Sequence, residues 1–183
     1  AAALGHRAYL DANFGFNYSL QNELIQGVTG ISHDVSWDIS GIGTNAAALN
    51  SADITTLIRD NGFQFWGHRT MSTDPQFAFE VAVRTDQFLI ETIQNGLKWA
   101  MGKPINLGLK NQIESSLNAK FAQLRADGLI MGALAWFDPN KNTAEMAMAG
   151  ALRISYKYTY TAPLEDLGVY PEITSDFYIN LFA

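Results

Sequence analysis

Residues 54–70, which read ITTLIRDNGFQFWGHRT, hold the clearest structural signal in the chain. The run Ile54 to Ile58 is apolar and β-branched, as inner strands are, and Phe63 to Trp66 is a second apolar run. Asn61 and Gly62 stand between the two runs, and this dipeptide adopts the left-handed backbone that a tight hairpin turn requires. The stretch therefore predicts a β-hairpin.

Upstream of the hairpin the sequence predicts short elements separated by polar, glycine-containing segments. Residues 1–14 predict a helix, and residues 45–52 predict one or two further helical turns. Val35, Trp37 and Ile39 alternate with polar residues, which favours a short strand. The residues expected on the packed side of the first helix are Leu4, Ala8 and Ala12.

Downstream of the hairpin two long helices are expected. Asp74 and Pro75 form a typical helix start, and residues 80–101 place their polar side chains on one narrow arc, so this helix should be largely buried. A second helix is expected over residues 107–126. Its apolar stripe consists of Leu109, Ile113, Leu117, Phe121 and Leu124.

The last third of the chain predicts strands followed by an extended tail. Residues 129–137 are apolar enough for a buried strand, and residues 153–160 alternate as a half-exposed antiparallel strand does. Residues 169–183 predict an extended arm with a final helical turn. The expected fold is α/β of an α+β-like kind, a single domain over residues 1–183. It would have a mixed sheet, two long central helices packed on it, C-terminal antiparallel strands and the tail.

Composition narrows the classes of function. The 183 residues carry a formal charge of −6, which disfavours binding to nucleic acid or an anionic membrane, and the chain has no Cys for thiolate chemistry. Charged residues are 16% of the chain, against about 25% in typical domains. Aromatic residues reach 12%. Protein interfaces favour aromatic over charged side chains, so part of this surface is expected to be covered by another protein.

Motifs for chemistry are weak. Residues 41–46, GIGTNA, together with Asp60 resemble a dinucleotide-binding turn in spacing, so a small nucleotide-binding enzyme built on residues 41–60 stays open as an alternative. His6, His33 and His68 lack the spacing of a metal site. The sequence predicts no catalytic residue, no cofactor and no metal, and hence a protein that is not an enzyme.

The second long helix is locally basic. Residues 103–127 carry four cations and two carboxylates, a net charge of +2 in an acidic chain. Lys110, Lys120 and Arg125 flank the apolar stripe, so the helix either presents a mixed basic and apolar face to an acidic protein or is an ordinary solvated helix.

Residues 55–70 resemble a stretch of contractile tail sheath proteins, as found in myophages and in R-type pyocins, with His68 where that family has Asn. Further segments agree in order, among them residues 27–31, 98–104 and 150–167. The resemblance covers nearly the whole chain and matches the C-terminal part of a longer subunit. A relative from type VI secretion sheaths is a second alternative.

The resemblance implies a structural homopolymer. Sheath subunits form hexameric rings stacked around an inner tail tube, joined by arms that add strands to a neighbour's sheet, and baseplate and tail terminator proteins are further partners. The implied location is the virion tail or a pyocin particle, assembled in the host cytoplasm. Lys110, Lys120 and Arg125 become candidates for the tube contact. The candidate linking residues are Ile154, Tyr156, Lys157, Tyr158, Tyr170, Ile173, Phe177, Tyr178 and Leu181.

Overall fold

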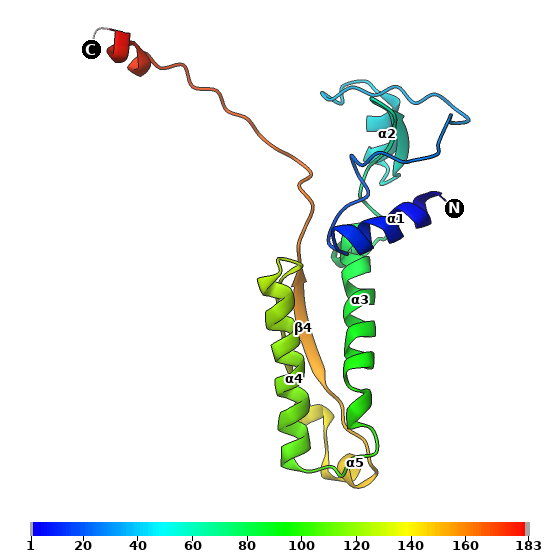
Figure 1. Ribbon diagram of the computed structural model, residues 1–183, viewed down its shortest axis with the longest axis vertical. Coiled ribbons are helices and arrows are strands. Elements are labelled where there is room, and N and C mark those ends of the chain that lie inside the picture. The colour runs from blue at the N-terminus through cyan, green and yellow to red at the C-terminus, as the bar shows by residue number, and fades with distance from the viewer. Residues whose placement is uncertain (1, 182–183) are drawn as a thin grey trace.

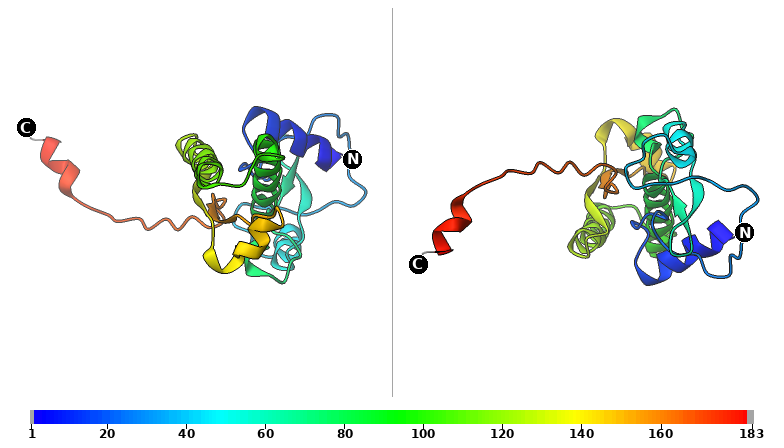
Figure 2. Two further views of the ribbon diagram at one scale, coloured as in Figure 1. Left: turned by 90° about the horizontal axis from the view of Figure 1, so that it is seen from below. Right: turned by 90° about the horizontal axis from the view of Figure 1, so that it is seen from above.

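The computed structural model describes residues 2–181, with side chains described up to residue 178. An elongated body carries a long thin segment that projects away from it near mid-height (Figure 1). We call residues 2–79 the upper region, residues 80–160 the lower body and residues 161–181 the arm. The views along the long axis confirm that the arm points away from all helices of the body (Figure 2).

The hairpin forms as the sequence predicts. β1 (Thr56–Arg59) pairs antiparallel with β2 (Phe63–Trp66), and the loop between them has positive φ angles at Asn61 and Gly62. Glycine tolerates this backbone because it has no Cβ, and asparagine tolerates it because its short side chain can hydrogen-bond locally. These properties explain the Asn-Gly pair. The hairpin is the only regular sheet among the described residues of the upper region.

The first helix is present, but the prediction of its packed face was wrong. α1 (Ala2–Asn13) buries His6 and Leu10. Leu4, Ala8 and Ala12 are exposed. The reason is the neighbour: the His6 ring lies 6.0 Å from the Phe65 ring of β2, so the helix turns this side toward the hairpin.

The predicted strand at Val35, Trp37 and Ile39 is also wrong, because the segment is irregular. Its backbone is hydrogen-bonded to the start of α2 (Asn45–Ser51) instead, because the carbonyl of Ser36 accepts from Ala46 N at 3.1 Å. The Trp37 ring packs edge-on against the Trp66 ring at 5.1 Å. The apolar alternation therefore reflects side-chain packing without a ladder partner.

Both long helices are confirmed. A 3-10 turn, η1 (Pro75–Phe77), is capped by Asp74 and leads into α3 (Glu80–Gly96), and η2 (Lys98–Ala100) follows it. α4 (Leu107–Ala126) begins at an Asn106 cap whose side chain accepts from Leu109 N. All five residues of the predicted stripe are buried.

The C-terminal strands pair with each other. β3 (Ile130–Trp136) and β4 (Ser155–Tyr160) form an antiparallel ladder with a bulge near Gly132, joined through η3 (Pro139–Lys141) and α5 (Ala144–Met148). The combination of helices and antiparallel strands is confirmed. The strands form two separate two-stranded sheets, however, and not one mixed sheet.

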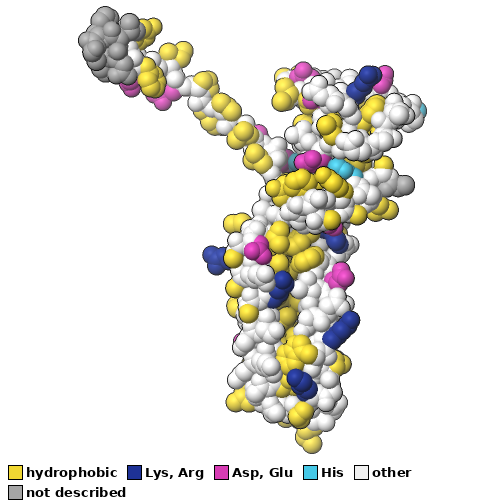
Figure 3. All heavy atoms as spheres, viewed as in Figure 1, with side chains coloured by type: hydrophobic (Ala, Val, Ile, Leu, Met, Phe, Trp, Pro, Cys, Tyr) yellow, Lys and Arg dark blue, Asp and Glu magenta, His cyan; other side chains and the backbone are white. Residues whose placement is uncertain are grey.

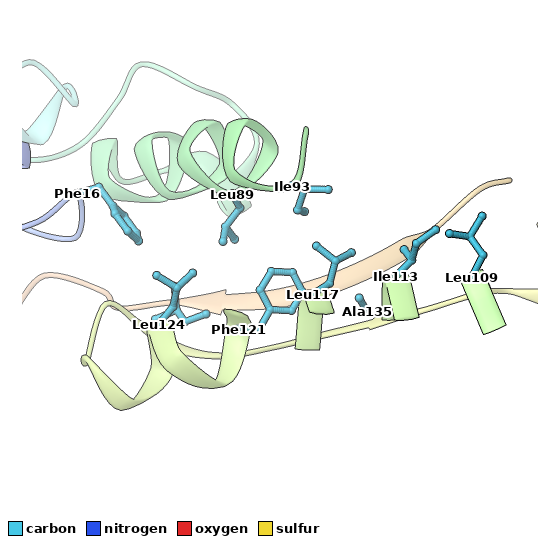
Figure 4. Packing of buried hydrophobic residues seen from close by; sticks show 10 residues of the cluster. Phe16, Leu89, Ile93, Leu109, Ile113, Leu117, Phe121, Leu124 and Ala135 are labelled. Atoms are coloured by element: carbon cyan, nitrogen blue, oxygen red, sulfur yellow. The ribbon is translucent and has the colours of Figure 1, made fainter. Parts of the chain in front are cut away.

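One apolar cluster holds the lower body together (Figure 4). Leu89 and Ile93 of α3 face the α4 stripe, with Phe121 at 1% exposure near the centre. β3 is buried on one side only, because Met131 and Leu134 of the expected buried run are exposed. The sheet therefore has an uncovered outer face.

The arm runs extended from residue 161 and ends in the 3-10 helix η4 (Asp176–Leu181). The tail that the sequence predicts is thus present as an extended segment with a terminal turn. η4 lies far from the body in all three views (Figures 1 and 2).

Candidate functional site: the free edge of β4 and the arm

The alternating tyrosines of β4 anchor the strand to both helices. The Tyr156 ring lies 6.3 Å from the Phe121 ring of α4, and Tyr158 Oη donates to Asp86 of α3 at 3.0 Å. Burial raises the pKa of the Tyr158 hydroxyl, and the hydrogen bond to Asp86 adds to the shift. Lys157 points to the opposite face, with Nζ 5.9 Å from the Trp136 ring. The side chains of β4 therefore hold the strand in place, and the Tyr158 hydroxyl stays protonated.

Asn118 of α4 shows which backbone groups of the sheet remain free. Its amide donates to the carbonyl of Ala135 at 3.0 Å and accepts from Ala135 N at 2.8 Å. These groups therefore point away from β4, which makes Ala135 and its partner Tyr156 a non-hydrogen-bonded pair. Tyr156, and with it Tyr158 two residues on, must direct N–H and C=O to the outer edge of β4.

The two edges of this sheet therefore differ. The β3 edge is occupied at Ala135 by the Asn118 side chain, whereas no backbone hydrogen bond from another described segment reaches the outer edge of β4. Unpaired donors and acceptors along a strand edge form a template for another strand. The lower body thus has one edge that is occupied at Ala135 and one edge able to accept a strand.

The arm carries apolar side chains that contact nothing in the body. Tyr170 is 94% exposed and Ile173 is fully exposed, and Phe177 and Tyr178 are also exposed. Hydrophobic side chains line the arm along its length (Figure 3). The side chain of Leu181, the last predicted linking residue, lies outside the described residues. An extended segment with this much exposed apolar surface is suited to bind another protein.

A polar cluster fixes the base of the arm. The guanidinium of Arg69 donates to both carboxylate oxygens of Glu165, each at 2.6 Å. His68 Nε2 lies 3.3 Å from the same carboxylate, and the other ring nitrogen of His68 contacts the Gln21 side chain. The Arg69 guanidinium holds the pKa of Glu165 below its usual range. This fork sets the direction in which the arm leaves the body.

Sequence reasoning missed this cluster. Arg69 and Glu165 stand 96 positions apart, and in the sequence His68 differs only slightly from the pattern of the family that the chain resembles. Each residue alone is an ordinary polar side chain in a loop. Only the tertiary structure brings them together, so no local pattern could have identified the fork.

The three cations of α4 are spread along the helix and form no cluster. Lys110 is partly buried, with Nζ 5.8 Å from the Phe137 ring, and Lys120 donates to Gln123 at 3.3 Å. Arg125 is exposed in the last turn. They therefore do not make a compact basic patch, although all three lie on one helix at the surface of the lower body.

The glycine turn does not have the architecture of a dinucleotide site. Gly41 and Gly43 take positive φ angles in a loop, and the helix after them, α2, has seven residues. The strand after α2 pairs antiparallel, and Asp60 lies in the hairpin loop. A βαβ unit, which this mode of nucleotide binding requires, is therefore missing from this stretch.

The described residues contain neither a candidate metal site nor a helix able to cross a membrane. In that part of the chain no group of three or more His and acidic side chains could hold a metal ion. Asp138 caps η3, and Thr143 caps α5. None of the described helices combines the length and the hydropathy that crossing a membrane would require.

Comparison with known proteins decides the family. A family model for the phage tail sheath C-terminal domain matches residues 72–174. The chain belongs to the phage tail sheath family. It is 45% identical over 181 residues to the tail sheath protein of Escherichia phage P2, covering 99% of this chain and 46% of that protein. It is 32% identical to a putative prophage major tail sheath protein of Pseudomonas aeruginosa strain UCBPP-PA14, over 97% of the chain and 46% of that protein.

Solved structures agree on the fold. The anti-feeding prophage baseplate structure contains a chain that matches with a TM-score of 0.81 at 17% identity, over 93% of this chain and 48% of that one. A sheath complex of an extracellular contractile injection system, in the contracted state, matches with a TM-score of 0.80 at 16% identity, over 94% and 50%. The sheath chain spans about half the length of the relatives it matches.

Proposed function

We propose that this chain is the C-terminal part of a structural subunit of a contractile tail sheath, and that it links subunits by strand exchange. In this role the subunits form hexameric rings stacked around an inner tube in a virion tail. The work is mechanical, with no turnover and no cofactor. Residues 1–183 act as one domain. Residues 169–183, which begin within the arm, act as its linking segment.

One observation supports this proposal: the chain has a strand edge with no backbone partner among the described residues, and an extended arm that points away from that edge. The outer edge of β4 offers the backbone groups of Tyr156 and Tyr158, and the arm offers an extended segment. The fork between Arg69 and Glu165 directs the arm away from its own β4. A second copy is then the natural source of the added strand.

Strand exchange suits a sheath that changes shape. Main-chain hydrogen bonds hold the joint, while residues 166–168, between the Glu165 contact and the added strand, act as a flexible connection. Rings can then rotate against one another as rigid bodies without losing the link. The contracted sheath complex that shares this fold is consistent with such a role.

We also propose that the sheath contacts the inner tube, the baseplate and the tail terminator, and that it assembles in the host cytoplasm. The tube contact is assigned to α4 through Lys110, Lys120 and Arg125. Their positions support a loose electrostatic contact along the helix, because the three charges are spread over its length.

Pro171 decides which N–H groups of the added strand can point toward β4. Proline has no N–H, so it fits an added strand only where that group would point away from β4. Because the direction alternates along a strand, the N–H groups of Tyr170 and Glu172 must point toward β4, and that of Val169 away from it. A second proline at Glu172 would remove a linking hydrogen bond, whereas a second proline at Val169 would not.

We therefore expect Glu172→Pro to weaken self-association of the chain strongly, as measured by sedimentation velocity over a range of concentrations. Glu172→Ala keeps the N–H and should associate nearly as well as the parent chain. Val169→Pro is the matched proline control. Equal association of Glu172→Pro and Val169→Pro, or a parent chain that stays monomeric at every concentration, would contradict strand exchange through the arm.

A further inference from the structure

The lower end of the body has an apolar groove with a basic rim. It has a volume of about 440 Å³ and lies between η2, the start of α4 and the residues that lead into β4. Met101, Ile105, Phe137 and Leu152 contribute apolar side chains, and Met101 is 82% exposed. Hydrophobic and basic side chains appear side by side at this end of the molecule (Figure 3).

The charges on the groove are all of one sign. Lys103 and Arg153 are the charged residues that line it, and no carboxylate does. Neither cation makes an ion pair with a described residue, although Lys103 Nζ stacks 4.4 Å from the Trp99 ring. A ligand that fits here should combine apolar side chains with negative charge.

The end of the arm has this chemistry. After Glu165, which is already paired with Arg69, the arm carries Asp166, Glu172 and Asp176 and has no Lys or Arg. Its exposed aromatic side chains, Phe177 and Tyr178, lie directly after Asp176 in η4. An acidic residue followed by an aromatic pair matches an apolar groove with a basic rim.

We propose that η4 of one copy docks in this groove of a second copy, and that the arm therefore adds to β4 in the antiparallel direction. This inference rests on the strand exchange proposed above. Pairing Tyr170 with Tyr158 in an antiparallel ladder would place Asp176 opposite Leu152, which lines the groove. A shift of two residues either way keeps the start of η4 beside residues 150–154.

Parallel addition would bring η4 to the other end of β4. The hollow there, beside Pro163 and Leu164, is lined by Glu23 and His68 and by no Lys or Arg. An acidic segment is repelled by that carboxylate, and no Lys or Arg lines the hollow to attract it. Charge therefore selects the antiparallel direction and the groove at the lower end.

In this geometry η4 cannot occupy the groove of its own chain. The arm departs from the upper end of β4, where Glu165 is held by Arg69, and η4 lies far from the lower end of its own body. Folding back would require the fork to open. A second copy can supply η4 with the fork intact.

Cysteine cross-linking tests the docking directly, because the chain has no Cys of its own. One chain carries Ser175→Cys just before η4. The other carries Ala151→Cys beside the groove or, as a matched control, Ala162→Cys at the far end of β4. We expect Ser175→Cys to form a disulfide-linked heterodimer with Ala151→Cys, at least tenfold more of it than with Ala162→Cys.

The possible outcomes separate the two proposals. Preferential linking to Ala162→Cys would overturn the groove docking and show parallel strand addition. Absence of both cross-links, with association that is still lost in Glu172→Pro, would overturn the docking and leave strand exchange standing. Absence of cross-links and of any association would overturn both.

Charge reversal supplies an independent readout. Lys103→Glu with Arg153→Glu should reduce the cross-link between Ser175→Cys and Ala151→Cys at least tenfold. Adding Glu172→Lys and Asp176→Lys to the arm chain should restore it. An unchanged yield in the reversed groove would overturn the charge argument, and circular dichroism of each variant checks that the body remains folded.

Discussion

The lower body and the contacts that direct the arm are stabilised by different interactions. The lower body has one continuous apolar cluster shared by α3, α4 and both strands, to which the upper region adds Phe16. The upper region also buries Leu10 and Ile58, and charged contacts link it to its neighbours: Arg7 contacts Asp11, Glu80 and two backbone carbonyls, and Arg69 holds Glu165. The strand edge is therefore presented by a body that is rigid through packing. The direction of the arm depends on a charged contact, which responds to pH and salt.

Tryptophan residues let the two regions be observed separately. Trp37 and Trp66 lie in the upper region, and Trp99 and Trp136 lie in the lower body. Replacing one pair by Phe leaves fluorescence that reports on the other region alone. Each prediction below can therefore be assigned to the region that it concerns.

The largest effect is expected from Phe121→Ala in the lower body. Phe121 is 1% exposed, so its truncation leaves a cavity and should lower the free energy of unfolding by about 4 kcal/mol. Urea denaturation followed by Trp99 and Trp136 measures the loss. Phe177→Ala is the matched control, because that ring is 79% exposed on the arm and should change stability very little. Similar losses in both variants would contradict the assignment of the core.

A smaller effect is expected from Arg7→Ala, which removes one of two polar links between α1 and α3. The Arg7 side chain is 11% exposed and lies 3.2 Å from Glu80. Its loss should cost about 2 kcal/mol, since hydrogen bonds to charged groups are lost while Asp11 keeps Arg84 at 2.8 Å.

Salt distinguishes the two stabilising mechanisms. The cost of Arg7→Ala should shrink as salt rises, because screening weakens the charges in the parent chain, while the cost of Phe121→Ala should not. Fluorescence of Trp37 and Trp66 follows the upper region in both variants. Exposed Arg59 is the control site for arginine removal. Salt-independent loss in Arg7→Ala would argue that its aliphatic stem, not its charge, matters.

The smallest effects are expected from two carboxylates that contact arginines of the upper region, Glu80 of α3 and Glu165 of the arm, with opposite signs. The Arg69 guanidinium lowers the folded pKa of Glu165, so its contribution is present above the unfolded pKa and lost as pH falls through the folded pKa. Burial raises the folded pKa of Glu80, so its contribution is present below the unfolded pKa and lost as pH rises through the folded pKa.

Two substitutions to glutamine separate these contributions. In acid titrations of unfolding, Glu80→Gln should remove a gain in stability on acidification, and Glu165→Gln should remove a loss. The arm base is expected to loosen in acid in the parent chain and to be pH-independent in Glu165→Gln, as followed by fluorescence anisotropy of a dye at Ser175→Cys. The same sign in both variants would contradict the assigned causes of the shifts.

The sequence predicted best where one element decides its own structure. The α4 stripe, the Asn61-Gly62 hairpin and the alternation of β4 each follow from local periodicity or turn chemistry, and all three are confirmed. The packed face of α1 was missed because His6 is buried by a partner, Phe65, that lies far along the chain. The same limit applies to the strand expected near Trp37. The Trp37 ring packs on the Trp66 side chain, and the segment has no partner strand.

The candidate site was predictable only in part. The alternating strand and the aromatic tail could be identified from residues 153–183, and the resemblance gave them a joint role. Which edge is free depends on Asn118, a polar residue of α4 that bonds to Ala135. No sequence pattern predicts this contact. The groove and the fork depend on residues drawn from distant segments, so they required the tertiary structure.

The fork at Arg69 also decides how the molecule bears a load. A neighbour that pulls on the arm transmits tension first to Glu165, five residues before the pull reaches Tyr160 at the end of β4. Two hydrogen bonds from one guanidinium share that tension side by side and pass it to the connection between β2 and α3. The β3–β4 ladder is thereby shielded from being peeled open from its end, so traction on the arm would swing the upper region before it could unzip the sheet.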